Sequence, residues 1–164
     1  MVKPLRHALQ LLTQIPAAPE GRADPVDVGR SVVAYPAVGL LLGLIVAAVA
    51  VLLPPAEPLT VAVALLVLWV GLTGILHLDG LADSADALFG GHGDPERTDA
   101  ILKDPQTGPA GVAAVVLVLA VKLAALVSLV GEAAWSVLIA VPLLGRTGAV
   151  WLFLTSPYVH AEGL

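Results

Sequence analysis

Two long runs of the sequence contain no charged side chain. Residues 31–56 and 58–78 lack Asp, Glu, Lys and Arg, and both runs are rich in Leu, Val and Ala. A helix of about 20 such residues crosses the roughly 30 Å hydrocarbon core of a bilayer. We therefore expect membrane-spanning helices near residues 32–53 and 58–77, joined by the tight proline-rich turn PPAEP.

Two more apolar segments follow in the second half of the chain. Residues 111–130 are interrupted only by Lys122, and residues 133–155 only by Arg146. Each is long enough to span the bilayer. The sequence therefore predicts an all-α fold, a polytopic transmembrane helix bundle with about four spans, an N-terminal interfacial segment and an acidic cytoplasmic loop.

The N-terminal residues partly resemble a signal peptide, because Lys3 and Arg6 precede a short apolar segment and a PAA sequence. The apolar part is too short, and Gln10, Thr13 and Gln14 interrupt it. We favour an amphipathic segment at the membrane interface.

The composition agrees with a membrane protein. Hydrophobic residues make up 58% of the chain and charged residues 13%, and the mean hydropathy is +0.93, far from the mix of a soluble domain. The 164 residues are enough for one membrane-embedded domain, residues 1–164. The chain has no cysteine, which excludes disulfides and thiolate ligands. No basic stretch or aromatic-rich patch indicates a nucleic-acid partner.

The basic residues near the span ends predict the orientation. In a four-span arrangement they all lie on one side of the membrane: Lys3, Arg6, Arg22, Arg30, Arg97 and Lys103. Because short cytoplasmic loops carry an excess of Lys and Arg, the termini and the acidic loop are predicted to be cytoplasmic. Within the first span, Gly39 and Gly43 form a GxxxG pattern, which indicates close helix packing.

Seven of the thirteen acidic residues lie between Asp79 and Asp104. If the second span continues as a helix past His77, Asp79, Asp83 and Asp86 lie within about 60° of one another on one helix face. Three ionised carboxylates that close repel each other unless a cation neutralises them. Magnesium, a hard cation that takes oxygen ligands, is the expected partner, and without Cys or paired His ligands zinc is disfavoured.

Other residues near the carboxylates extend this interpretation. Gly90 and Gly91 allow a ligand to approach the backbone closely, and Arg97 and Lys103 supply positive charge. Together these residues indicate a pyrophosphate site in which magnesium bridges phosphate oxygens and a free aspartate accepts a proton from an attacking hydroxyl. The alternative is a solvated acidic loop at the membrane surface.

Two cations lie inside apolar spans, where a charge is costly unless it faces a cavity or a partner. Lys122 and Arg146 are candidates for contact with an anionic substrate; an interhelical ion pair or snorkelling is the alternative. His77 has either a direct role at the site or a structural role at the helix end.

The motif HLDGLADSADALFGG, followed by ILKDPQTGPAGVAAVVLVLAVKLAAL, resembles the signature of the cobalamin synthases, the adenosylcobinamide-GDP ribazoletransferases. The opening segments LLTQIP and RSVVAYPAVGLLLG are also similar to that family, so the resemblance covers essentially the whole chain. It implies an enzyme of the cytoplasmic (inner) membrane of a prokaryote. The implied reaction joins alpha-ribazole, or its 5'-phosphate, to adenosylcobinamide-GDP: a ribose hydroxyl attacks the phosphorus on the cobinamide arm and GMP leaves.

The resemblance also implies magnesium as the cofactor and suggests roles for residues in matching motif positions. Asp79, Asp83 and Asp86 correspond to metal-binding or catalytic acids, with His77, Lys103 and Asp104 as neighbours. Three features depart from the family pattern. Ala87 stands where glycine is common, Gln106 replaces an arginine of the KDSR pattern, and the chain is shorter than usual, so a C-terminal segment with further helices is expected to be missing.

Two other functions compete with this one. A cation transporter or channel fragment would place acidic residues in the middle of spans and show a repeated half, whereas these acids lie at a span end and no repeat is found. A CDP-alcohol phosphotransferase also uses clustered aspartates in a membrane bundle, but its DGxxAR motif does not occur in the sequence.

Overall fold

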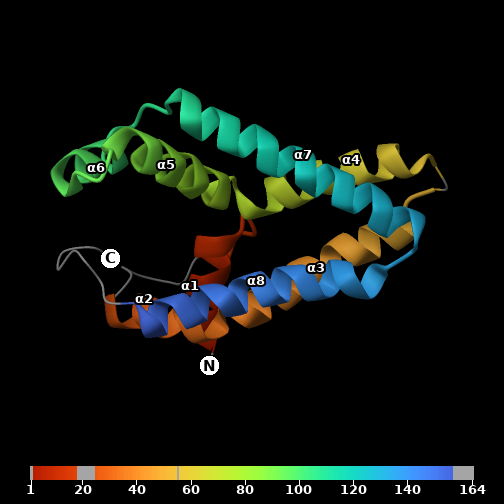
Figure 1. Cartoon of the computed structure of the whole chain (residues 1–164). Helices are drawn as coiled ribbons and strands as arrows, with labels where there is room; N and C mark the ends of the chain where they lie inside the picture. Colours follow the sequence, from red (N-terminus) through yellow and green to blue (C-terminus); the bar gives the residue numbers. More distant parts are fainter. Residues whose placement is uncertain (1, 18–24, 55, 157–164) are drawn as a thin grey trace. The chain divides into compact units, whose positions relative to one another are not determined.

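The computed structural model describes residues 2–17, 25–54 and 56–156. These residues form helices and connecting segments, with no β-strand among them (Figure 1). The helices are, in chain order, α1 (Val2–Leu12), α2 (Pro25–Ser31), the short 3-10 helix η1 (Val32–Ala34), α3 (Tyr35–Leu52), α4 (Pro58–Thr73), α5 (Leu76–Gly91), α6 (Pro95–Leu102), α7 (Pro109–Gly131) and α8 (Trp135–Thr155).

Three helical segments are long and apolar enough to cross a membrane, which confirms the predicted class of fold. They are Val26–Leu52, Pro109–Gly131 and Trp135–Thr155, and α4 with α5 supplies a fourth if this interrupted pair counts as one span. The predicted spans near 32–53, 111–130 and 133–155 therefore correspond to single helical segments. The chain is a membrane protein with three to four apolar spanning helices.

The second predicted span differs from the structure. We expected one helix near residues 58–77, but α4 ends at Thr73 and α5 begins at Leu76. Between them Gly74 and Ile75 both have left-handed backbone angles, with φ of 63° and 67°. Glycine adopts this conformation freely, whereas for a β-branched residue such as Ile75 it is strained.

The segment after α1 contacts the C-terminal end of α4. The backbone N–H of Gln14 donates a hydrogen bond of 2.8 Å to the carbonyl oxygen of Leu72. A β-carbon on Gly74 would collide with the Gln14 side-chain amide. Glycine at position 74 therefore leaves room for Gln14, which lies about 60 residues away in sequence.

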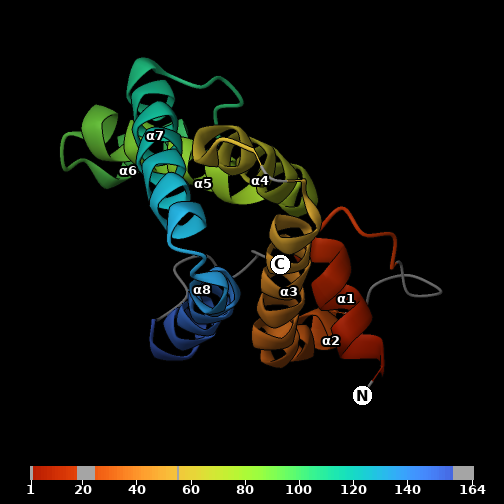
Figure 2. The ribbon, with the colours of Figure 1, turned by 90° about the vertical axis from the view of Figure 1, so that its right-hand side faces the viewer.

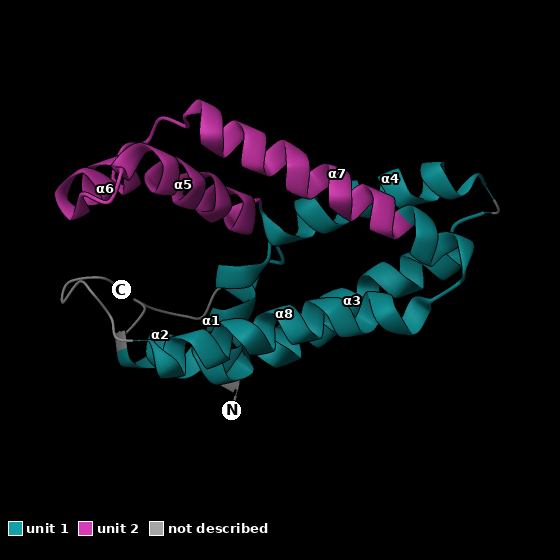
Figure 3. Cartoon of the chain, viewed as in Figure 1, with its two compact units in different colours: residues 1–74, 127–164 teal, residues 75–126 magenta. Residues whose placement is uncertain are grey.

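The chain divides into two compact units, residues 1–74 with 127–164 and residues 75–126 (Figure 3). The expectation of a single membrane-embedded domain over residues 1–164 stays a prediction. In the first unit α3 packs along α8 (Figure 2). Gly39 and Gly43 of the GxxxG pattern face Pro142 and Ile139 of α8 at distances that leave no room for a β-carbon. The predicted packing role of these glycines is confirmed.

Helix α1 is amphipathic, as expected from its sequence, and lies beside α3 in Figure 2. Its apolar side packs on α3: Ala8 forms a buried cluster with Tyr35, Val38 and Leu42. Burial of this apolar side stabilises the packing of α1 on α3. An interfacial position for α1 remains a prediction, and Arg22, one of the basic residues behind the predicted orientation, lies outside the described residues.

The acidic stretch that we expected as a loop is largely helical. Helix α5 carries His77 and the three aspartates, and α6 packs against its C-terminal part. The turn between them places His92 and Gly93 in left-handed conformations. Asp94 then caps α6 by accepting a hydrogen bond of 3.0 Å from the backbone N–H of Glu96, a typical N-cap interaction. Helical structure fixes the carboxylates more firmly than a loop would.

Candidate active site

The first three aspartates of the acidic stretch project from α5. Because α5 is a continuous helix from Leu76 to Gly91, Asp79, Asp83 and Asp86 share one face, as the spacing predicts. Asp79 is exposed, and Asp83 and Asp86 are half-buried. Apart from Leu78, the buried residues of α5 are small, which lets neighbouring helices pack closely: Ala82, Ala85, Ala87 and Gly91.

Asp86 has both carboxylate oxygens engaged by the N-terminus of α7. Its Oδ2 accepts a hydrogen bond of 2.7 Å from the backbone N–H of Gly108, and its Oδ1 accepts one of 2.8 Å from the backbone N–H of Gly111. The first N–H groups of a helix have no partner within the helix, and a negative charge is favourable at this end. We call this interaction the Asp86 cap.

Two glycines allow α7 to come this close. A β-carbon on Gly108 would lie 2.6 Å from Oδ1 of Asp86. A β-carbon on Gly111 would collide with the same carboxylate and would lie 2.8 Å from the carbonyl oxygen of Ala82. Both distances are shorter than carbon–oxygen contact allows, so any larger residue would push α7 away from α5.

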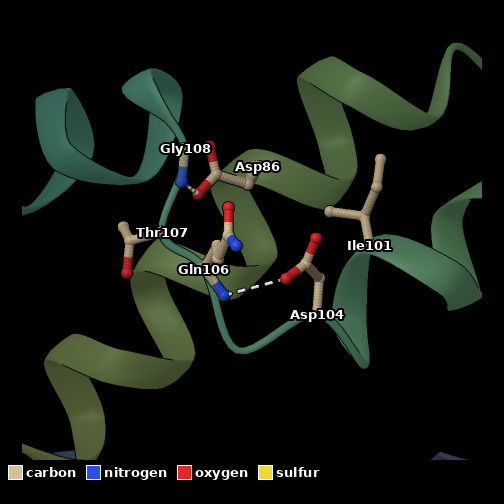
Figure 4. Close-up of a pocket in the computed structure, with 6 residues that line it drawn as sticks. All are labelled: Asp86, Ile101, Asp104, Gln106, Thr107 and Gly108. Atoms are coloured by element: carbon tan, nitrogen blue, oxygen red, sulfur yellow. Dashed lines mark hydrogen bonds between the residues drawn. The ribbon is translucent and has the colours of Figure 1, made fainter.

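A polar pocket of about 290 Å³ opens beside the Asp86 cap. Its lining comes from α5, from α6 and from the segment that joins α6 to α7 (Figure 4), and the residues are Asp86, Ile101, Asp104, Gln106, Thr107 and Gly108. Asp104 shapes the connecting segment, because its Oδ1 accepts a hydrogen bond of 2.9 Å from the backbone N–H of Gln106. Gln106, where the family resemblance would place an arginine, therefore lines a pocket that contains two carboxylates.

A second, apolar pocket of about 330 Å³ lies along α5 and α7. Asp79 and Thr107 are its polar lining residues; the others are Ile75, Leu78, Ala82, Val112, Val115 and Val116. Thr107 lines both pockets. This arrangement sets a carboxylate that can accept a proton next to a space suited to an apolar group.

The structure does not bring all the predicted substrate-binding residues to these pockets. Gly90 and Gly91 contact Ile101 and Thr98 of α6, so the close approach they permit is between helices. Lys103 pairs with Asp99 at 2.6 Å on the exposed side of α6. The side chain of Arg97 is exposed. A role for these residues toward phosphate stays a prediction.

The two cations of the spans lie in different helices. Lys122 is in α7 and Arg146 is in α8, and both side chains are half-buried. Their expected contact with an anionic substrate stays a prediction. His77 is exposed at the first turn of α5.

The carboxylates of α5 can supply part of the coordination shell of a magnesium ion, but not all of it. Within the described parts of the chain, no group of three or more His, Cys, Asp or Glu side chains could hold a metal ion. Asp79 and Asp83 lie one turn apart on α5, and a protein commonly holds magnesium through one or two carboxylates while substrate phosphates and water complete the octahedron. This pair of hard oxygen donors suits a magnesium ion that arrives with a phosphorylated ligand.

Thr107, Gly108 and Gly111 were missed as site residues by the sequence interpretation. The segment Thr107–Gly111 reads TGPAG, in which proline stands at the first position of a helix and glycine stands where a capping side chain is usual. That pattern could have indicated a helix N-terminus capped from elsewhere in the chain.

The fold and the site define an α-helical membrane protein with a carboxylate-bearing helix beside two pockets. The model of the cobalamin-5-phosphate synthase family matches residues 4–164, so the chain belongs to this family.

Curated relatives are similar along almost the whole chain. The adenosylcobinamide-GDP ribazoletransferase of Stutzerimonas stutzeri (strain A1501) is 50% identical over 98% of this chain and 66% of its own length. The proteins of the same name from Ectopseudomonas mendocina (strain ymp) and Pseudomonas fluorescens (strain Pf0-1) are also 50% identical, over 100% and 98% of this chain and 67% and 66% of their own lengths. The chain thus spans about two thirds of the length of these relatives. No solved structure matches it.

Proposed function

We propose that the chain acts in a membrane transferase that joins alpha-ribazole, or alpha-ribazole 5'-phosphate, to adenosylcobinamide-GDP and releases GMP. The name that these relatives share and their 50% identity over nearly all of this chain support the proposal. The structural observation that carries it is the pair Asp79 and Asp83 on one face of α5, with Asp79 lining the apolar pocket.

Asp79 and Asp83 are the groups proposed to hold magnesium. When bound, the ion supplies charge neutralisation for the diphosphate of the activated substrate. Neither carboxylate takes part in a hydrogen bond or ion pair with another described residue, so their oxygens remain available. The carboxylate that is less engaged accepts the proton of the attacking ribose hydroxyl.

The pockets suggest where the two substrates bind. Asp79 borders the apolar pocket, so an acceptor whose base lies in this pocket can bring a ribose hydroxyl to this carboxylate. Lys122 and Arg146 are proposed to contact the anionic, GDP-bearing substrate, because a cation within an apolar span is stabilised by a polar cavity or an anion. Arg97 and Lys103 are proposed to attract the same anionic substrate through their positive charge.

The proposed location is the cytoplasmic (inner) membrane of a prokaryote, with α5 and α6 on the cytoplasmic side. The basic residues near the span ends support this orientation.

The experiment is a turnover assay of the purified chain in detergent or lipid. The chain is incubated with adenosylcobinamide-GDP, alpha-ribazole and magnesium, and the cobamide product and GMP are measured. A longer version with the C-terminal part that the relatives possess is assayed beside it. A CDP-alcohol with its acceptor serves as the alternative substrate pair. Cobamide formation by neither version, or turnover of the CDP-alcohol, would refute the proposal.

A further inference from the structure

We propose that Asp86 is a positioning residue and does not serve as a magnesium ligand. It holds the N-terminus of α7 against α5 and thereby fixes the segment from Asp104 to Gly108, which lines the polar pocket. Of the three aspartates on α5, the two toward its N-terminus are left for the metal. The kinetic part of this inference rests on the proposed transferase function, whereas its structural part does not.

The geometry separates Asp86 from the other two carboxylates. Both of its oxygens accept a backbone hydrogen bond, at 2.7 Å from Gly108 and 2.8 Å from Gly111. These donors lie 22 and 25 residues further along the chain, so the Asp86 cap is a long-range contact between two helices. Hydrogen bonds to an ionised acceptor are about twice as strong as neutral ones.

The residues of α7 that face Asp86 are matched to this contact. Position 108, where a helix usually carries a capping Ser, Thr, Asp or Asn, is a glycine with no side chain to cap α7. The β-carbon missing from Gly108 would lie 2.6 Å from Asp86. The one missing from Gly111 would lie 2.8 Å from the Ala82 carbonyl oxygen, one helical turn before Asp86. Asp86 therefore takes over the cap that the local sequence omits.

The Asp86 cap also sets the shape of the pocket. Gly108 is the last residue of the connecting segment, and its N–H is held by Asp86. At the other end of the segment, Asp104 holds the N–H of Gln106. Thr107 lies between these two fixed points and lines both pockets. Releasing the Asp86 cap frees one end of the segment and changes the position of Thr107 and Gln106.

Asp86→Asn is the decisive variant, because an amide keeps the size of the side chain but offers one acceptor oxygen where the carboxylate offers two. One of the two N–H groups then faces an NH₂ group. We expect hydrogen exchange of the backbone over residues 104–112, followed by mass spectrometry, to become at least about tenfold faster. With a saturating non-reactive GDP conjugate of cobinamide present, the magnesium concentration that gives half of the maximal rise in melting temperature should remain that of the wild type.

Gly111→Ala is the second variant, and it alters no carboxylate. Its methyl group separates α5 from α7, so it should speed exchange over residues 104–112 as Asp86→Asn does. Gly131→Ala, at the other end of α7 with open space around the added methyl, is the matched control and should exchange as the wild type does. If Asp86→Asn does not fold, Gly111→Ala still tests the Asp86 cap.

Kinetics separates positioning from a purely structural role. In the turnover assay, Asp86→Asn and Gly111→Ala should raise KM for adenosylcobinamide-GDP by about tenfold, with the magnesium concentration for half-maximal rate unchanged. Asp83→Asn should instead raise the magnesium concentration for half-maximal rate and leave KM for adenosylcobinamide-GDP unchanged. A lost magnesium response in Asp86→Asn with wild-type exchange over residues 104–112 would overturn the inference. If magnesium does not shift even the wild-type melting temperature, the proposed metal role fails, and the exchange data alone decide the Asp86 cap.

Discussion

Gly43 of α3 lies directly against Ile139 of α8: a β-carbon built at position 43 would stand 2.6 Å from the Ile139 carbonyl oxygen. The neighbouring glycine of the GxxxG pattern, Gly39, has the same relationship to Pro142. Because lipid is as apolar as a leucine side chain, helices in a membrane gain stability from such close backbone packing.

Gly43→Ala should destabilise the protein by about 1–3 kcal/mol, because the added methyl forces α3 and α8 apart. Gly145→Ala is the matched control: position 145 is in α8 and has open space around a β-carbon, so alanine there should be neutral or stabilise the helix by up to about 1 kcal/mol. Thermal unfolding in one detergent measures both. Equal melting temperatures for the two variants would contradict the close packing of α3 against α8 at Gly43.

Asp79→Asn and Asp83→Asn should each raise the magnesium concentration needed for half-maximal turnover by about tenfold or more. Each change removes one charged oxygen ligand and preserves the size of the side chain. The metal-free variants should melt no lower than the wild type, since removing a charge relieves carboxylate repulsion.

The control for the aspartate variants is Glu96→Gln, which removes the same charge from the exposed first turn of α6. It should leave the magnesium dependence unchanged. If the magnesium-induced rise in melting temperature is the same in the wild type and both aspartate variants, Asp79 and Asp83 are a solvated helix face and hold no metal.

Lys122→Met and Arg146→Met should weaken binding of the GDP-bearing substrate by about tenfold or more, because a half-buried cation in an apolar span is expected to face an anion. Methionine keeps an unbranched apolar side chain of similar length, so packing is largely preserved. Binding is measured by titration and stability by melting. Normal binding with a lowered melting temperature would assign both residues a structural role.

Single cysteines at Gly93 and Ala56 should react with a membrane-impermeant thiol reagent from opposite sides of the membrane. The chain has no other cysteine, and both positions are exposed. Gly93 lies in the turn before α6 and is predicted to be cytoplasmic, whereas Ala56 lies in the turn before α4. Labelling of both from the same side would contradict the predicted orientation.

The sequence by itself determined the features that depend on short stretches of chain. Apolar runs of about 20 residues predict spanning helices because hydrophobic length is a local property, and α7 and α8 lie where those runs predict. The spacing of Asp79, Asp83 and Asp86 places them on one face of any helix. The HLDGLADSADALFGG motif indicated the family, which the match over residues 4–164 confirmed.

Tertiary structure alone decided where the helix is interrupted between α4 and α5, and what each carboxylate of α5 contacts. The break at Gly74 and Ile75 lies where Gln14 contacts the end of α4. The apolar run from 58 to 78 gives no sign of this contact, because it comes from a distant part of the chain. The three aspartates look equivalent in sequence, yet Asp86 is bound by N–H groups 22 and 25 residues away. Which backbone donors reach a side chain depends on how distant helices pack, and local spacing carries no information on that.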